Sequence, residues 1–136
     1  MERKIEKDVL FLSQKSQPAT MADLPVAIDL EDTLMANRER CVGLAANMIG
    51  EKKCIITFAF AMGCLTMFNP QIIKKSQPYD TVEGCLSLCG ERPTKRYEVI
   101  TVKYQDKSFK WHTQEFRGYV AQIIQHEIDH CNGIII

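Results

Sequence analysis

Two histidines four residues apart, near the end of the chain, have a spacing that suits metal chemistry. His126 and His130 follow the His-Glu-x-x-His pattern across residues 126–130. On an α-helix, side chains four apart lie on one face, so both imidazoles could bind one metal ion. Glu127 would project about 100° further round the helix and could reach a metal-bound water without binding the metal. The pattern is short, and an ordinary helix with two core or solvated histidines also fits it.

The segment that carries this pattern is expected to be a buried helix over residues 118–131. It is apolar on most sides, with Ile123 and Ile128 on different faces, and Asn132-Gly133 would end it. A helix of this kind is expected to be wrapped by a sheet. Its histidines would then lie in the interior, where unpaired polar groups are costly, so burial favours a bound partner for both of them.

A third ligand is needed, because a catalytic metal site usually has three protein ligands and one open position. The remaining histidine, His112, falls in an expected exposed hairpin and is a weak candidate. Among six cysteines, Cys85 stands out, because the loop of residues 83–87 (Glu-Gly-Cys-Leu-Ser) would present it between two strands. Taken alone, this segment also fits an ordinary loop at the edge of a strand. Reduced thiols are expected, because the chain is rich in core residues and shows no secretory signal. It has no Cys-x-x-Cys pair, so a thiolate ligand would come singly.

The composition indicates an ordinary globular protein, expected to form a single domain over residues 1–136. Seventeen acidic and seventeen basic residues give a formal net charge of zero. No basic field indicates direct binding to nucleic acid or to an anionic membrane. The first seven residues alternate in charge and lead into no long apolar run, so neither a signal peptide nor a membrane span is expected. We therefore expect a cytoplasmic protein.

The remaining elements predict an α+β fold rather than alternating strands and helices. After an irregular stretch over residues 1–22, a first helix is expected to begin behind Asp23 and to end at the charged cluster 38–40. Antiparallel strands and a late helix follow. The expected strands cover residues 54–60, 64–68 (ended by Asn69-Pro70), 71–75, 97–104, 109–113 and, after the late helix, 134–136.

Three short motifs, in one order, identify a family. Residues 41–48 are small and apolar without a clean period, which fits a tight packing crossover or the close approach of a ligand. The segment 43–46 (Gly-Leu-Ala-Ala), the loop 83–87 and the segment 125–130 (Gln-His-Glu-Ile-Asp-His) together resemble the three signature motifs of peptide deformylases. The resemblance covers nearly the whole chain. It implies antiparallel β-sheets wrapped around a central C-terminal helix, with one N-terminal helix.

The resemblance also implies the chemistry of a metal-dependent amidohydrolase. Cys85, His126 and His130 would bind a divalent metal, ferrous iron in this family, with zinc, nickel or cobalt able to substitute. Glu127 would act as general base and then as general acid. The backbone N–H of Leu86 would stabilise the oxyanion, together with the metal.

The implied substrates are N-formylmethionyl peptides of nascent proteins, from which formate is released, in association with the ribosome. One wall of the cleft would pair with the backbone of the peptide, and a pocket would hold the methionine side chain. The residues implied for substrate binding are Val42, Gly43 and Leu44 for the backbone, Met48 at the end of the first motif, and Glu83, Tyr119 and Ile123 for the pocket.

Two positions depart from the family pattern. Met48 stands where the first motif normally has a glutamine whose amide completes the oxyanion hole, and a thioether cannot donate a hydrogen bond. Cys41 replaces the motif's first glycine and would narrow the cleft if it faces inwards. Three hypotheses follow: Asn47 replaces the missing amide, the enzyme is slow, or the protein is a paralogue that binds metal and formyl-peptides with weak or no activity. A zinc peptidase is a weaker alternative, which the cysteine ligand and the small-residue motif disfavour.

The sequence ends at Ile136, where many members of the family continue into a further helix. That helix lies outside the three motifs. We therefore expect the chemistry to be independent of it.

Overall fold

The computed structural model describes residues 1–136 as a sheet of five strands with helices on both sides of its first strands. The strands are β1 (Gly43–Ala45), β2 (Ile55–Phe60), β3 (Gly63–Cys85), β4 (Leu88–Gln105) and β5 (Trp111–Arg117). They lie in the order of the chain, and each pairs antiparallel with the next. The helices are α1 (Val9–Leu12), α2 (Leu24–Ala36) and α3 (Gly118–Cys131), with 3₁₀ turns η1 (Met21–Asp23) and η2 (Ala46–Ile49).

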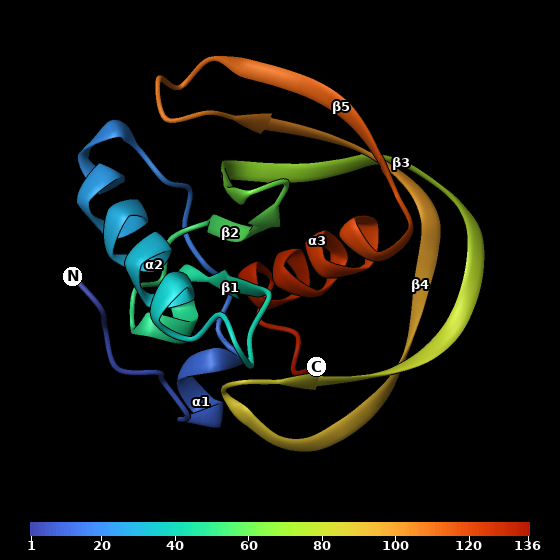
Figure 1. The fold of residues 1–136 in the computed structure, drawn as a ribbon, viewed down its shortest axis with the longest axis horizontal. Coiled ribbons are helices and arrows are strands. Elements are labelled where there is room, and N and C mark those ends of the chain that lie inside the picture. The colour runs from blue at the N-terminus through green and yellow to red at the C-terminus, as the bar shows by residue number, and fades with distance from the viewer.

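The sheet curves around α3, which lies at the centre of the molecule (Figure 1). The long ribbon of β3 and β4 bends past one end of α3 and continues beneath it, while α2 lies beyond β1 and β2. Register shifts between Phe68 and Gln71, between Ile72 and Lys74, and between Gly84 and Cys85 accompany this bend. Such irregularities let a strand change direction without losing its partner. The expected α+β fold around a central C-terminal helix is confirmed, with one bent sheet.

Three local expectations were wrong. Asn69-Pro70 does not end a strand; it lies at a bulge inside β3, where Asn69 has a φ of 53°. The Asn69 side chain accepts a hydrogen bond from the Ala19 N–H (2.8 Å) and donates one to the Ala19 carbonyl (3.0 Å), which stabilises the unusual backbone. Residues 134–136 form no strand. The stretch 1–22, expected to be irregular, contains the one-turn helix α1 as well as η1.

The helix α2 forms as predicted, with Pro25 in its first turn, where a missing N–H costs nothing. Leu30 and Leu34 are buried against the sheet. No helix of the fold combines the length and the apolar character that crossing a membrane requires.

The side chain of Gln125 fixes α3 to the middle of β4. Its Oε1 accepts from the backbone N–H of Tyr97 (2.9 Å), and its Nε2 donates to the Tyr97 carbonyl (2.8 Å). The Gln125 amide thus pairs with Tyr97 as a neighbouring strand would. α3 ends at Cys131, and two residues later Gly133 has a φ of 74°, which favours glycine. A Cβ on Gly133 would lie 2.5 Å from the carbonyl oxygen of Ser13.

Candidate metal centre

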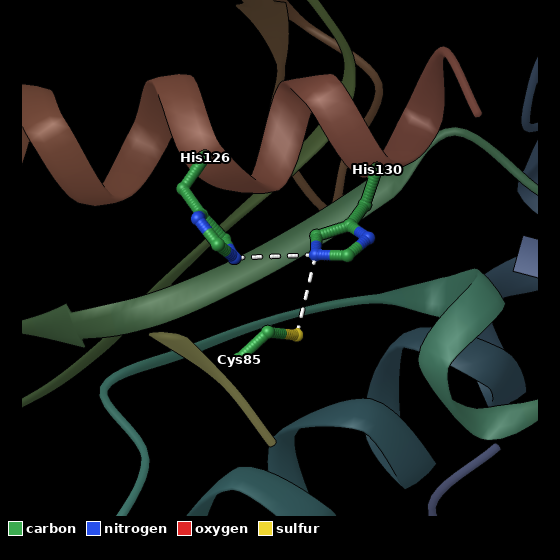
Figure 2. A group of neighbouring side chains, drawn as sticks. All are labelled: Cys85, His126 and His130. Carbon is green, nitrogen blue, oxygen red and sulfur yellow. Dashed lines mark hydrogen bonds between the residues drawn. The ribbon is translucent and has the colours of Figure 1, made fainter. Parts of the chain in front are cut away.

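One thiol and two imidazoles meet in the interior (Figure 2). Cys85 comes from the last position of β3, and the two histidines come from successive turns of α3. The Cys85 Sγ lies 3.3 Å from the His130 Nε2, which lies 3.2 Å from the His126 Nε2. All three atoms lie within 4.8 Å of one another. The three residues predicted as ligands therefore converge on one point.

These separations fit a single tetrahedral cation. With usual metal–nitrogen and metal–sulfur bond lengths, two such nitrogens are about 3.3 Å apart, and a sulfur and a nitrogen about 3.6 Å. Thiolate and imidazole suit zinc and iron-group ions better than magnesium or calcium, which prefer oxygen. The donor set of Cys85, His126 and His130 therefore fits a divalent transition-metal ion.

The His126 ring is oriented by a buried carboxylate. Its Nδ1 lies 2.8 Å from the Glu83 Oε1, so Nδ1–H donates to the carboxylate and the Nε2 lone pair is directed at the centre. Burial alone would lower the pKa of His126, but Cys85 and Glu83 outweigh it and raise this pKa to about 10. A cation bound at Nε2 would therefore displace a proton from that nitrogen. The Glu83 carboxylate thus holds the ring and favours positive charge at the site.

Glu83 itself is embedded in a buried hydrogen-bond network. Arg96, 4% exposed, donates from Nη2 (2.7 Å) and Nε (2.9 Å) to the two oxygens of Glu83, and from Nη1 to Asp129 (2.7 Å). Gln122 donates to the Glu83 Oε2 (2.9 Å). Burial alone would raise the pKa of Glu83, but hydrogen bonds from His126 and Arg96 lower it to about 2. Glu83 therefore stays ionised beside the site.

His130 is fixed by its backbone rather than by its ring. Its carbonyl accepts a hydrogen bond from the Asn47 Nδ2 (2.9 Å). The His130 Nδ1, which points away from Cys85 and His126 in Figure 2, is buried without a hydrogen-bond partner, as is the Asn47 Oδ1. Because the amide N–H₂ of Asn47 is used at the end of α3, this geometry argues against Asn47 as a replacement for the missing glutamine amide.

Glu127 is a buried carboxyl group with an unpaired oxygen. Its side chain is 4% exposed overall, and its Oε1 has no hydrogen-bond partner. Burial raises its pKa to about 7. Gly43 makes room for it, because a Cβ on Gly43 would lie 2.9 Å from both the Glu127 Oε2 and the Ile123 Cγ2. A carboxyl group with a pKa near neutrality can both accept and donate a proton.

The centre opens into a cleft of about 590 Å³ between β1, the β3–β4 turn and α3. Leu44 and His130, predicted as site residues, are fully buried and do not line it. The other ten predicted site residues do: Val42, Gly43, Met48, Glu83, Cys85, Leu86, Tyr119, Ile123, His126 and Glu127. Tyr119 is well exposed and stands at the rim.

The two positions that depart from the family pattern both line this cleft. The Cys41 thiol donates to the Gly43 carbonyl (3.0 Å), and burial raises its pKa to about 12, so it is a neutral group. Met48 is 1% exposed, and its Sδ accepts from the Ala45 N–H (3.4 Å). Neither side chain offers a strong donor to a ligand in the cleft.

Some residues of the site were not predicted from the sequence. Arg40, Val82 and Gln122 line the cleft, and Arg96 anchors the network beneath it. Gln122 lies four residues before His126 on the same face of α3, and this spacing was the one available signal. No pattern in the sequence indicated that Arg40 or Val82 would line the cleft.

Comparison with known proteins agrees with this geometry. The family model described as "Polypeptide deformylase" matches residues 4–136. A peptide deformylase of Clostridium beijerinckii is 57% identical over 136 residues, which is 100% of both chains. The chain belongs to the peptide deformylase family. Another member, from Thermoanaerobacter pseudethanolicus, is 35% identical over 98% of this chain and 84% of its own.

Solved structures of the family share the fold. A class I type b peptide deformylase from Acinetobacter baumannii, crystallised with Met-Ala-Ser bound, has a TM-score of 0.88 at 26% identity and covers 99% of this chain and 97% of its own. The Thermotoga maritima enzyme has a TM-score of 0.89 at 26% identity, over 99% and 95% of the two chains.

Membership establishes the activity. Peptide deformylases are metal-dependent hydrolases that remove the N-formyl group from N-formylmethionyl peptides of nascent proteins and release formate, and this chain is an enzyme of that kind. The predicted family and enzyme class are confirmed. The comparisons give no support to the alternative of a paralogue that only binds metal and peptide.

Proposed function

We propose that Cys85, His126 and His130 bind one divalent cation, ferrous iron in the cell, and that Glu127 moves the proton. The observation that carries the proposal is the convergence of one sulfur and two Nε2 atoms within 4.8 Å beside a buried carboxyl group. When bound, the cation supplies a Lewis acid for the formyl oxygen and lowers the pKa of bound water.

Glu127 supports deformylation because it is buried and its Oε1 has no hydrogen-bond partner. It accepts the proton of the attacking water and later delivers it to the leaving amine of methionine. The backbone N–H of Leu86, in the two-residue turn after Cys85, donates to the developing oxyanion. The thiolate of Cys85 makes the centre electron-rich and, being sulfur, sensitive to oxidation.

The peptide is held along the edge of the sheet. β1 pairs with β2 on one side alone, so its other edge can accept an extended peptide. We assign these hydrogen bonds to the backbone groups of Val42, Gly43 and Leu44 that β2 leaves free. The Val42 carbonyl is not one of them, because it accepts from the Ala59 N–H (2.8 Å). Glu83, Tyr119 and Ile123 line the space for the methionine side chain, and Met48 packs against the bound formyl end.

The chain acts as one domain over residues 1–136, since buried apolar residues from all three helices and all five strands form one cluster. Its place of action follows from its substrate, because formyl-methionine begins a nascent chain. We place the enzyme in the cytoplasm, at the ribosome, without direct contact with nucleic acid, in keeping with a net charge of zero.

Formate release from a formyl-Met peptide, with bound metal measured in parallel, tests these roles. Protein loaded anaerobically with ferrous iron should bind one ion per chain and turn over faster than protein loaded with zinc. Cys85→Ala should lose the ion. If Cys85→Ala bound iron with native affinity, or if zinc and iron gave equal rates, the ligand set or the choice of metal would be wrong.

A further inference from the structure

The mouth of the cleft carries one exposed charged side chain. Arg40, two residues before Val42, is exposed and lines the cleft. The lining also contains two glutamates and one histidine, and all three are buried: Glu83, Glu127 and His126. A ligand outside the buried centre therefore meets a cation and no exposed carboxylate of the lining.

Burial along β1 and η2 sets the direction in which a bound peptide leaves. Beyond Gly43, the wall passes into the interior: Leu44, Ala45 and Ala46 are fully buried, and Met48 is 1% exposed. In the other direction Val42 is 38% exposed, and Arg40 is exposed. A peptide whose formyl end lies beside Cys85 therefore runs outward past Val42 toward Arg40.

Arg40 is within reach of the residues that follow formyl-methionine. It precedes Gly43 by three residues and lies in the turn of residues 37–40, beside the outer end of the cleft. Three residues span at most about 10 Å, which is the length of the second and third residues of a paired peptide. The Arg40 Nη2 donates to the Asn37 Oδ1 (3.0 Å), which steadies the guanidinium. Other arginines of the chain form ion pairs with Asp29, Glu83 and Glu115, whereas Arg40 forms none. Its charge is free to act on a ligand.

We infer that Arg40 determines specificity, favouring peptides with an acidic side chain at the second or third residue over peptides with a basic one. The inference rests on the proposed binding of the peptide along β1. Because Arg40 is neither a proposed metal ligand nor a proposed proton-transfer group, its effect should appear mainly in KM rather than kcat. An exposed ion pair contributes weakly, so we expect kcat/KM for the acidic peptide to exceed that for the basic one by about fivefold.

The test uses the iron-loaded enzyme and three amidated peptides, formyl-Met-Ala-Glu, formyl-Met-Ala-Gln and formyl-Met-Ala-Lys, with a second set varied at residue two. The ratio of kcat/KM for the acidic peptide to that for the basic peptide should fall toward one at roughly 0.5 M salt, where screening is strong. Arg40→Gln should remove it and Arg40→Glu should reverse it. Arg38→Glu is the matched control, because Arg38 is also exposed, does not line the cleft and changes the net charge equally.

The results separate this inference from the activity itself. Hydrolysis of the neutral peptide with equal rates for the acidic and basic peptides would overturn the role of Arg40 and leave the deformylase reaction intact. The same peptides titrated against iron-loaded Glu127→Gln protein give the comparison without turnover. Equal affinities there would overturn the inference as well, whereas failure to hydrolyse any peptide would count against the proposed catalytic roles alone.

Discussion

The two walls of the cleft differ in how many hydrogen bonds they contain. On the α3 side, His126 is held by Glu83, and Glu83 is held by Arg96 and Gln122. On the β1–η2 side, Met48 replaces an amide with a thioether. In the mechanism that we propose, metal binding is therefore supported by more hydrogen bonds than stabilisation of the oxyanion is.

The largest expected effect is on the α3 side. Glu127→Gln should lower kcat for a formyl-Met peptide by roughly 10²- to 10⁴-fold, because the general base and acid is lost. Bound iron, measured by elemental analysis, should stay at the native level, since Glu127 is not a ligand in our proposal. Glu115→Gln, on the exposed face of β5, is a control that should keep native activity. Native turnover by Glu127→Gln would exclude the assigned role.

The opposite wall should respond in the other direction. Met48→Gln is expected to raise kcat by about 100-fold, because one donor to an oxyanion is typically worth that much or more. Steady-state formate release measures it. Met35→Gln, on an exposed position of α2, controls for the substitution itself. An unchanged kcat would mean that Met48 does not face the oxyanion, and the contrast between the two walls would lose its catalytic meaning.

The network beneath His126 should affect metal binding rather than the reaction. Glu83→Gln keeps the size of the side chain but removes the charge that Arg96 and His126 share. Loss of such a partner of a metal ligand typically weakens metal affinity by about 10- to 100-fold. Competition with a chelator measures this, and kcat at saturating iron should change less than the affinity does. Native chelator resistance would show that the carboxylate does not support the ligand.

The smallest effect is expected where α3 ends. Gly133→Ala places a Cβ 2.5 Å from the Ser13 carbonyl oxygen at a φ of 74°. We expect the free energy of unfolding in urea to fall by about 1–3 kcal/mol, with little change in kcat of the folded protein. Gly63→Ala, where a Cβ would meet nothing within 4 Å, is the matched control. Equal stabilities of the two variants would contradict the assigned packing.

The sequence predicted what depends on local spacing. His126 and His130 are four residues apart, and that spacing alone places both on one face of a helix. Cys85, by contrast, was one of six cysteines, and the resemblance of its motif was needed to select it. The end of α3 at Asn132-Gly133 was also readable, because glycine at this position is a local signal.

What could not be predicted depends on contacts between distant segments. Asn69-Pro70 is typical of a strand end, but the backbone of Ala19 pairs with the Asn69 side chain and keeps β3 continuous through a bulge. Arg96 joins Glu83 and Asp129, which are far apart in the chain. The exposure of Arg40 in the cleft likewise required knowing which side of β1 faces solvent.

The pairing of Gln125 with Tyr97 has a consequence for measurement. The Tyr97 amide hydrogen is bonded to a side chain of α3, so it becomes free to exchange with deuterium only when α3 separates from β4. Its exchange rate therefore reports how often the helix that carries both histidines leaves the sheet. Because Tyr97 is next to Arg96, the exchange rate of this single amide indicates whether the metal centre is assembled, and it can be compared in protein with and without iron.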